Sequence, residues 1–219
     1  MNLDLILRFL SNLKKNNNRE WFQDNKSKYI EANEAFIELV SHIINQIGKF
    51  DPDISVLEPK KCVFRIYRDV RFSKNKDPYK TNFGASMRPE GRKSPFGGYY
   101  LHLHQEESFV AGGIYHPEPA HLAKIRQEID YNPGPINKII SNKKFLSVFE
   151  SVKGDELKRP PKGFDAEHPD IELLKHKDFI VYCPLKNKLV KSPEFLKTAI
   201  SYYKLIKPFN DYFNTAIRD

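Results

Sequence analysis

The residues best suited to chemistry form one short run, Phe64–Phe72. Side chains alternate between the two faces of a strand, so a strand here would place apolar residues on one face and polar residues on the other. The polar face would hold Arg65, Tyr67, Asp69 and Arg71. Guanidinium groups form forked hydrogen bonds with phosphate or carboxylate oxygens, so this face predicts an anion-binding site.

The same strand is predicted to extend over Cys62–Phe72 and to bury its apolar face, which comprises Cys62, Phe64, Ile66, Val70 and Phe72. Arg68 falls on that face, which indicates either a bulge or a buried arginine with a partner. Two interpretations of the arginines stay open. They bind an external anion, or they form an internal network of salt bridges around Asp69.

A polar loop follows the arginines, and it completes the candidate anion site with Lys74, Lys76, Tyr79 and Lys80. Because this loop is contiguous with the arginine run, its lysines could close over an anion held there. The alternative is a solvated connection without a ligand. Arg92, which lies further along the chain, is expected to contribute much less than Arg65 or Arg71.

The charge of the chain is concentrated around this candidate site. Residues 60–93 hold eleven basic and three acidic residues, an excess of eight that equals the formal net charge of +8. The sequence pI is about 9.3. A basic patch of this kind attracts phosphate groups, nucleic acid or acidic proteins.

Histidines form a second candidate group. His102 and His104 would share one strand face, and His116 ends the next predicted strand. Three converging imidazoles would suit a metal ion, but the favoured interpretation is that His102 packs beside Tyr100 with a satisfied hydrogen bond. No metal site is therefore predicted, and no cofactor is indicated.

Three other features allow a chemical or a structural interpretation. Asp165, Glu167 and His168 could supply acid–base chemistry if they lie near the basic residues. Trp21 could stack on a base, although packing is favoured. Gly112 and the glycine after it lack the context of a nucleotide-binding motif and indicate crowded backbone instead.

The elements that must position these residues follow from hydrophobic periodicity and turn signals. Apolar residues at helical spacing predict a helix over residues 3–13 and a second from Asn17, with Glu20 as its capping partner, to Gly48. Strands are predicted over Cys62–Phe72, Phe83–Met87, Tyr99–His104, Phe109–Tyr115 and Phe179–Cys183.

Helical signals return in the C-terminal part. They predict helices over residues 122–129 and 136–149, and Ser192 begins a further helix that Pro208 kinks or ends. Helices thus flank a run of adjacent strands. This order predicts an α+β fold, with a mainly antiparallel central sheet flanked by helices from the N- and C-terminal parts, and residues 1–219 as a single domain.

Composition bears on the cellular location that we expect for the protein. No run of 18 apolar residues occurs, so no membrane span is predicted, and the N-terminus lacks the apolar core of a signal peptide. Cys62 and Cys183 lack the spacing of a metal site or a disulfide. We therefore expect free thiols and a cytoplasmic location.

Long motifs support a family resemblance. The chain contains RIYRDVRFSKNKDPYKTNFGA, preceded by NNNREWF and followed by GGYYLHL, AGGIYHP and PPKGFDAEHP. Over nearly its whole length it resembles the family catalogued as domain of unknown function 2461. The family pattern usually has an acidic residue just before the loop lysine, where this chain has Asn75. The resemblance implies a fold and emphasises these motifs, but it implies no reaction.

Three functions are compatible with these observations. The first is a basic surface that binds a phosphate-bearing ligand or nucleic acid, on whose bases the strand tyrosines could stack. The second is an enzyme acting on a small phosphorylated or carboxylated substrate in an arginine-lined pocket. The third is a scaffold for an acidic protein. The concentrated charge favours the first.

Overall fold

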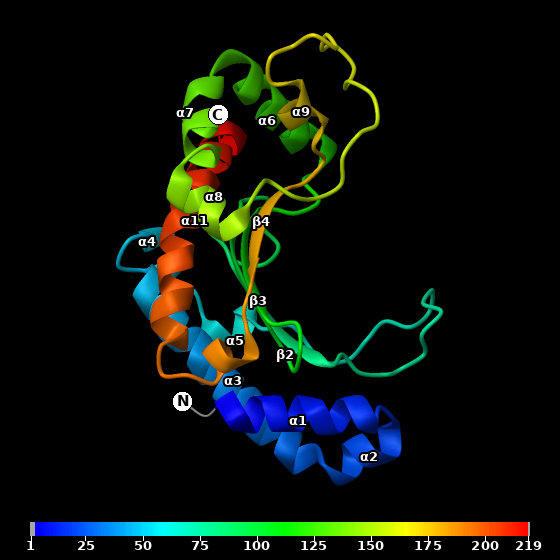
Figure 1. Cartoon of the computed structure of the whole chain (residues 1–219). Helices are drawn as coiled ribbons and strands as arrows, with labels where there is room; N and C mark the ends of the chain where they lie inside the picture. The colour runs from blue at the N-terminus through cyan, green and yellow to red at the C-terminus, as the bar shows by residue number, and fades with distance from the viewer. Residues whose placement is uncertain (1–2, 219) are drawn as a thin grey trace.

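The centre of the fold is a four-stranded antiparallel sheet within residues 3–218, which the computed structural model describes (Figure 1). Its strands lie side by side in chain order: β1 (Asn82–Met87), β2 (Gly98–His104), β3 (Phe109–Ile114) and β4 (Phe179–Pro184). The predicted α+β class with a mainly antiparallel sheet is confirmed. Four of the predicted strands match these elements to within two residues.

Short and long helices precede the sheet. They are α1 (Leu3–Lys15), α2 (Arg19–Asp24), α3 (Lys26–Ile47), α4 (Pro52–Ser55) and α5 (Pro59–Cys62). Phe83 of β1 stacks on Phe36 of α3 and on Phe9 of α1, with ring centroids 5.3 and 6.2 Å apart. The N-terminal helices therefore cover one face of the sheet through aromatic contacts.

The C-terminal helices lie between β3 and β4 and after β4. They are α6 (Pro119–Tyr131), α7 (Pro133–Ile140), α8 (Lys143–Phe149), α9 (Ile171–Lys175), α10 (Asn187–Val190) and α11 (Phe195–Arg218). The helix predicted over residues 136–149 is two helices, because Asn142 caps α8 by accepting hydrogen bonds from two backbone amides. None of the helices within residues 3–218 is long and apolar enough to span a membrane.

Helix α11 is joined to β2 and the residue before it by buried side-chain amides. Asn214 both accepts a hydrogen bond from Gly97 N (2.7 Å) and donates one to Gly97 O (3.1 Å), and Asn210 donates to Gly98 O (3.0 Å). Earlier in α11, the Tyr203 hydroxyl donates to Tyr100 O, further along β2, at 3.0 Å. Side chains of α11 thus hydrogen-bond to backbone groups of the sheet inside the core.

Close contact between α11 and β3 depends on Gly112. A Cβ atom at this position would lie 2.3 Å from Cγ2 of Ile206, a fully buried residue of α11. At Gly113 the backbone has φ +109°, which L side chains rarely adopt, and a Cβ would lie 2.0 Å from Phe179 O. Crowded backbone, as predicted for this pair, is confirmed.

The predicted strand Cys62–Phe72 is wrong. Cys62 ends α5, and the following segment contains only isolated bridges, Val63 with Ala85 and Tyr67 with Tyr79. Beyond Ile66 the chain leaves the edge of the sheet, so the alternating side chains have no core to enter. Phe72, predicted to be buried, is 95% exposed. Residues 65–80 instead form a projecting excursion, which we call the arm (Figure 1).

The predicted second helix is also divided. It breaks at Asn25 into α2 and α3, and its N-cap is Asn18, which accepts a hydrogen bond from Trp21 N. Asn17, predicted to be the cap, holds the arm instead. Its side chain donates to Tyr79 O (3.0 Å) and accepts from Tyr79 N (3.1 Å). The sequence does not distinguish adjacent asparagines, because the partner is 62 residues away.

Pro208 does not end its helix, since α11 continues to Arg218. A proline inside a helix costs about 3 kcal/mol because a hydrogen bond is lost and the ring is crowded. Ile206, Phe209 and Phe213 flank it and are fully buried. Each such side chain contributes about 1.5–3 kcal/mol when it leaves water, so their burial outweighs the loss.

Replacing Gly112 with alanine should lower the free energy of unfolding by roughly 1–3 kcal/mol, because the added methyl group overpacks the contact with α11. Gly134→Ala in α7 is the matched control, since a Cβ there meets nothing within 4 Å. Urea unfolding followed by circular dichroism compares the two. Equal midpoints for the two variants would contradict the close contact as a source of stability.

Candidate functional site

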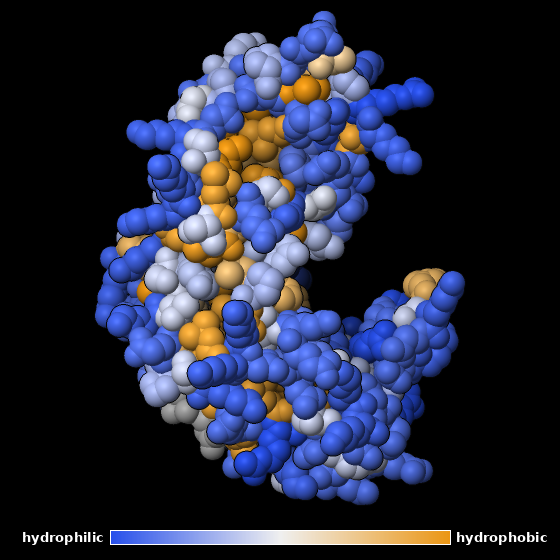
Figure 2. All heavy atoms as spheres, viewed as in Figure 1, coloured by the Kyte–Doolittle hydropathy of each residue, from blue (hydrophilic) through white to orange (hydrophobic). Residues whose placement is uncertain are grey.

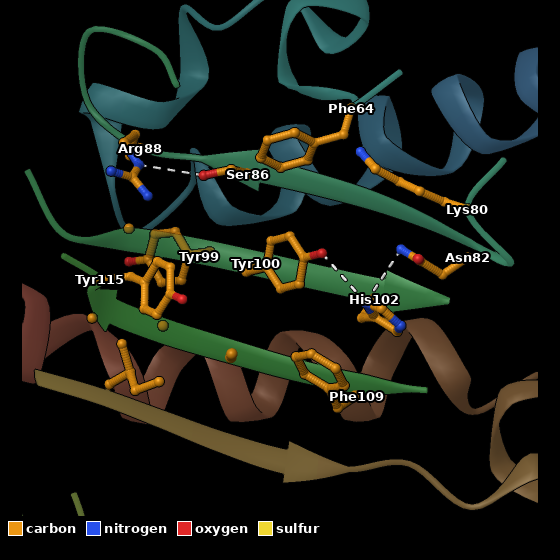
Figure 3. Close-up of a pocket in the computed structure, with 15 residues that line it drawn as sticks. Phe64, Lys80, Asn82, Ser86, Arg88, Tyr99, Tyr100, His102, Phe109 and Tyr115 are labelled. Atoms are coloured by element: carbon orange, nitrogen blue, oxygen red, sulfur yellow. Dashed lines mark hydrogen bonds between the residues drawn. The ribbon is translucent and has the colours of Figure 1, made fainter. Parts of the chain in front are cut away.

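The face of the sheet that the helices leave open carries a groove of about 510 Å³ (Figure 3). Its floor consists of the outward-pointing residues of the strands, and Phe64 and Tyr115 add walls from flanking segments. This is the opposite face from the one that packs on α11. Strand alternation therefore separates the two roles of the sheet, so that one set of side chains builds the core and the other set lines the groove.

Six of the fifteen residues that line the groove carry aromatic rings. Phe64 lies edge-on to Tyr100 with centroids 6.2 Å apart, and Phe109 stacks on His102 at 4.5 Å and 11°. Gly84 makes room for the Tyr100 ring, since a Cβ there would lie 2.5 Å from the hydroxyl oxygen. Burial raises the pKa of Tyr100 to about 12, so its hydroxyl stays protonated and can donate a hydrogen bond.

Arg88 supplies a half-buried positive charge at one end of the groove (Figure 3). Its Nε donates to Ser86 Oγ and its Nη1 to Ser94 O, both at 3.3 Å. Within residues 3–218 it forms no ion pair with a carboxylate. Burial lowers the pKa of Arg88, but a guanidinium remains charged in proteins, so its charge lacks a counter-ion.

His102 is neutral and has a defined tautomer. Its Nδ1 lies 3.4 Å from the Asn82 amide nitrogen and 3.3 Å from the Tyr100 hydroxyl. An amide nitrogen only donates, so Nδ1 accepts and the ring proton resides on Nε2. Burial, with a smaller effect of His104, lowers the pKa of His102 to about 4. The residue therefore offers the groove a neutral N–H donor.

Lys80 and Arg92 place their charges over the ring of Phe64, and the charge of Arg65 acts on Lys80. Lys80 Nζ lies 5.6 Å and Arg92 Cζ 4.9 Å from the centre of the Phe64 ring, and Lys80 also donates to Arg65 O at 3.0 Å. We call Arg65, Lys80 and Arg92 the cationic rim. Burial lowers the pKa of Lys80, and the charges of Arg65 and Arg92 lower it further. No member pairs with a carboxylate in the described part of the chain.

Of the nine residues predicted for the anion site, Lys80 alone lines the groove, and the others belong to the arm. Arg71 pairs with Asp69 at 2.6 Å, and this bond lowers the pKa of the Asp69 carboxyl. Arg68 donates to Asp77 O and to Ser73 Oγ, both at 3.2 Å. Arg71 and Arg68 thus stabilise the arm internally, whereas Arg65 forms no ion pair with a carboxylate among residues 3–218.

The remaining predicted residues differ in exposure. Tyr79 is buried and stacks on Phe22 at 3.9 Å and 13°, whereas Tyr67 is 48% exposed. Lys76 donates to Val70 O at 3.1 Å, and Lys74 is exposed to solvent. Tyr79 therefore fixes the root of the arm, while the lysines lie towards its free end.

The sequence prediction missed several residues of the groove. Phe64 was assigned to the core, and Arg88 was counted only as part of the basic segment. The usable signal was strand alternation, because Asn82, Ser86 and Arg88 share the face opposite to Phe83. The favoured packing of His102 beside Tyr100 is confirmed, with ring centroids 6.1 Å apart.

The other candidate groups lie elsewhere. His168 Nε2 is 3.0 Å from Asp130 Oδ1 on α6, and His116 Nδ1 is 3.1 Å from the buried carboxylate of Asp178. Neither pair is among the residues that line the groove. Trp21 packs against Phe9 with centroids 6.3 Å apart, as favoured. Within residues 3–218, no three histidine, cysteine or acidic residues are grouped to hold a metal.

Comparison with known families gives a match that covers nearly the whole chain. A family profile described as "Conserved hypothetical protein (DUF2461)" matches residues 5–212. The chain belongs to this family. No curated protein and no solved structure shows significant similarity to it.

His102→Gln should reduce the sensitivity of the fold to acid. The ordinary pKa of histidine is about 6.5, and the folded value is about 4. The unfolded chain therefore binds the extra proton first, and wild-type stability is lost as the pH falls from about 6.5 towards 4. At pH 4.5 the loss from this residue is on the order of 2 kcal/mol. Glutamine does not titrate, so the variant loses less.

Urea unfolding of both proteins at pH 7 and pH 4.5 measures this difference. A loss of stability that is the same in the variant and the wild type would show that His102 is not held neutral by its surroundings.

Proposed function

We propose that the protein binds a small organic anion that carries an aromatic ring, and that it does so in the groove on the open face of the sheet. The observation that carries this proposal is Arg88, a half-buried guanidinium without a carboxylate partner at the end of an aromatic groove. A charge that is partly removed from water is stabilised by a counter-ion, so a bound anion would supply the missing partner.

The rest of the groove suits the same ligand. Its rings provide flat apolar surfaces for an aromatic group, and His102 Nε2–H is a donor for polar edges. No aspartate or glutamate is among the described residues that line it. The groove therefore favours an anion over a cation as well as an aromatic group over a purely polar one.

Binding is better supported than catalysis. The residues described as lining the groove include no thiol or carboxylate that could serve as a nucleophile or a general base. His102 could exchange a proton, but its Nδ1 already accepts hydrogen bonds from neighbouring side chains. An enzyme acting on a small phosphorylated or carboxylated substrate is the second proposal, and the arginine in the groove supports it to the same extent as binding.

Titration calorimetry with 2-naphthyl phosphate tests the proposal. We expect binding to the wild type, and a loss of about ten- to one-hundredfold in Arg88→Met, because hydrogen bonds to charged groups contribute about 1.5–3 kcal/mol. Methionine keeps the approximate length of the side chain while removing its charge and its donors.

Two comparisons make the result specific. Lys143→Met removes an exposed cation of α8 and should bind as the wild type does. Neutral 2-naphthol should bind the wild type more weakly than 2-naphthyl phosphate does. The two compounds should bind Arg88→Met with equal affinity. Equal affinity of both compounds for the wild type would show that the groove does not select anions.

A further inference from the structure

The cationic rim would be stabilised by a bound anion that is separate from the anion at Arg88. Lys80 and Arg92 place like charges over the single ring of Phe64, Arg65 adds a third charge that acts on Lys80, and no carboxylate pairs with them among residues 3–218. Like charges held together repel one another, and an anion placed between them would remove this repulsion. The rim is separate from Arg88, which lies half-buried at the other end of the groove.

Phosphate fits the rim well. It has several acceptor oxygens and can contact more than one cation, and the guanidinium groups of Arg65 and Arg92 can each present two donors. Both arginines are exposed, so they can reorient towards a ligand. A ligand that also reached Arg88 would need a second anionic group on the other side of the aromatic floor.

Positive charge continues from the rim along the arm. Residues 66–79, between the two rim residues of the arm, contain four basic and two acidic residues, a net charge of +2. Lys74 and Lys76 are exposed, and Phe72 is 95% exposed, with Arg71 as the cation near its ring at 5.8 Å. A mononucleotide in the groove would not reach these residues. A chain of phosphates with attached rings would use both the charge and the exposed ring.

The shape of the molecule agrees with an extended ligand. Figure 2 shows a hollow between the arm and the part of the molecule that contains α6 and α9, with a largely hydrophilic arm and an apolar spot at its free end. The hollow leads to the open face of the sheet. A strand lying along the arm could therefore place one ring in the groove.

The strand would have to be single. In a duplex the bases are paired and stacked inside, whereas unpaired bases can turn outwards and stack on aromatic side chains. Phosphate contacts from lysine and arginine would supply affinity without sequence preference.

We infer that the protein binds single-stranded nucleic acid, with one base in the aromatic groove, its backbone phosphates on the cationic rim, and the following nucleotides along the arm to Phe72. This inference rests on the proposed function, because it identifies the aromatic anion in the groove as a nucleotide of a longer chain.

Fluorescence anisotropy with labelled octathymidylate tests the inference. We expect it to bind at least about tenfold more tightly than the mononucleotide dTMP, measured by competition, because the mononucleotide lacks the contacts along the arm. Log affinity should fall with log salt at a slope of about −2, since each phosphate contact on a single strand contributes about −0.7. Arg65→Ala and Arg92→Ala should each weaken binding roughly tenfold and reduce this slope.

Two further variants locate the ends of the strand. Phe72→Ala should weaken binding of the octamer by at least about fivefold, since stacking on a side chain contributes that much per base. Binding of dTMP should be unaffected. Lys143→Ala removes the same charge from α8 and should bind as the wild type does. Circular dichroism confirms that each variant is folded.

The outcomes separate the two proposals. Binding of 2-naphthyl phosphate together with an octamer no tighter than dTMP would overturn the nucleic-acid inference and leave the groove function standing. Octamer binding that depends on Arg65 and Arg92 but is unaffected by Arg88→Met and by 2-naphthyl phosphate would overturn the use of the groove. Phe72-dependent binding to phosphatidylserine vesicles, with no octamer bound, would overturn the inference in favour of a lipid surface.

Discussion

The contact between α11 and the sheet is the constraint on which the other features depend. Ile206 occupies the space that a side chain at Gly112 would need, and the amides of Asn210 and Asn214 hold the backbone before and at the start of β2. Because this contact fills one face of the sheet, the alternate side chains must point the other way. The aromatic groove is thus a direct result of how tightly the opposite face is packed.

The same alternation explains what the sequence could predict. Segments such as Phe83–Met87 and Phe179–Cys183 carry short apolar patterns bounded by turn residues, and they form strands where expected. The segment Cys62–Phe72 has a similar pattern but pairs with β1 only at Val63 and Phe64, before the chain leaves the sheet. Local periodicity describes which residues could face a core. It does not show whether a core is present beside them, and this is why Phe72 lies in solvent.

The candidate site was predictable in its charge and not in its location. The concentration of basic residues drew attention to residues 60–93, which include Lys80 and Arg88 of the groove and Arg92 over the ring of Phe64. The partition between paired and free arginines depends on contacts across the fold. Arg71 finds Asp69 two residues away, whereas Arg92 meets Phe64 and Lys80 from a different loop. Arg92 therefore lies beside a residue that lines the groove, which its position in the sequence did not indicate.

The amide contacts of α11 also bear on how the chain is synthesised. Asn214 forms hydrogen bonds with a residue 117 positions earlier. Helix α11 therefore cannot cover its face of the sheet until α11 has left the ribosome. Until then Leu101, Val110 and Val181, all fully buried in the folded protein, lack part of their packing. Contacts so distant in sequence form slowly because a long loop must close first. The nascent chain thus passes through a stage in which the face that later becomes core is exposed and prone to association.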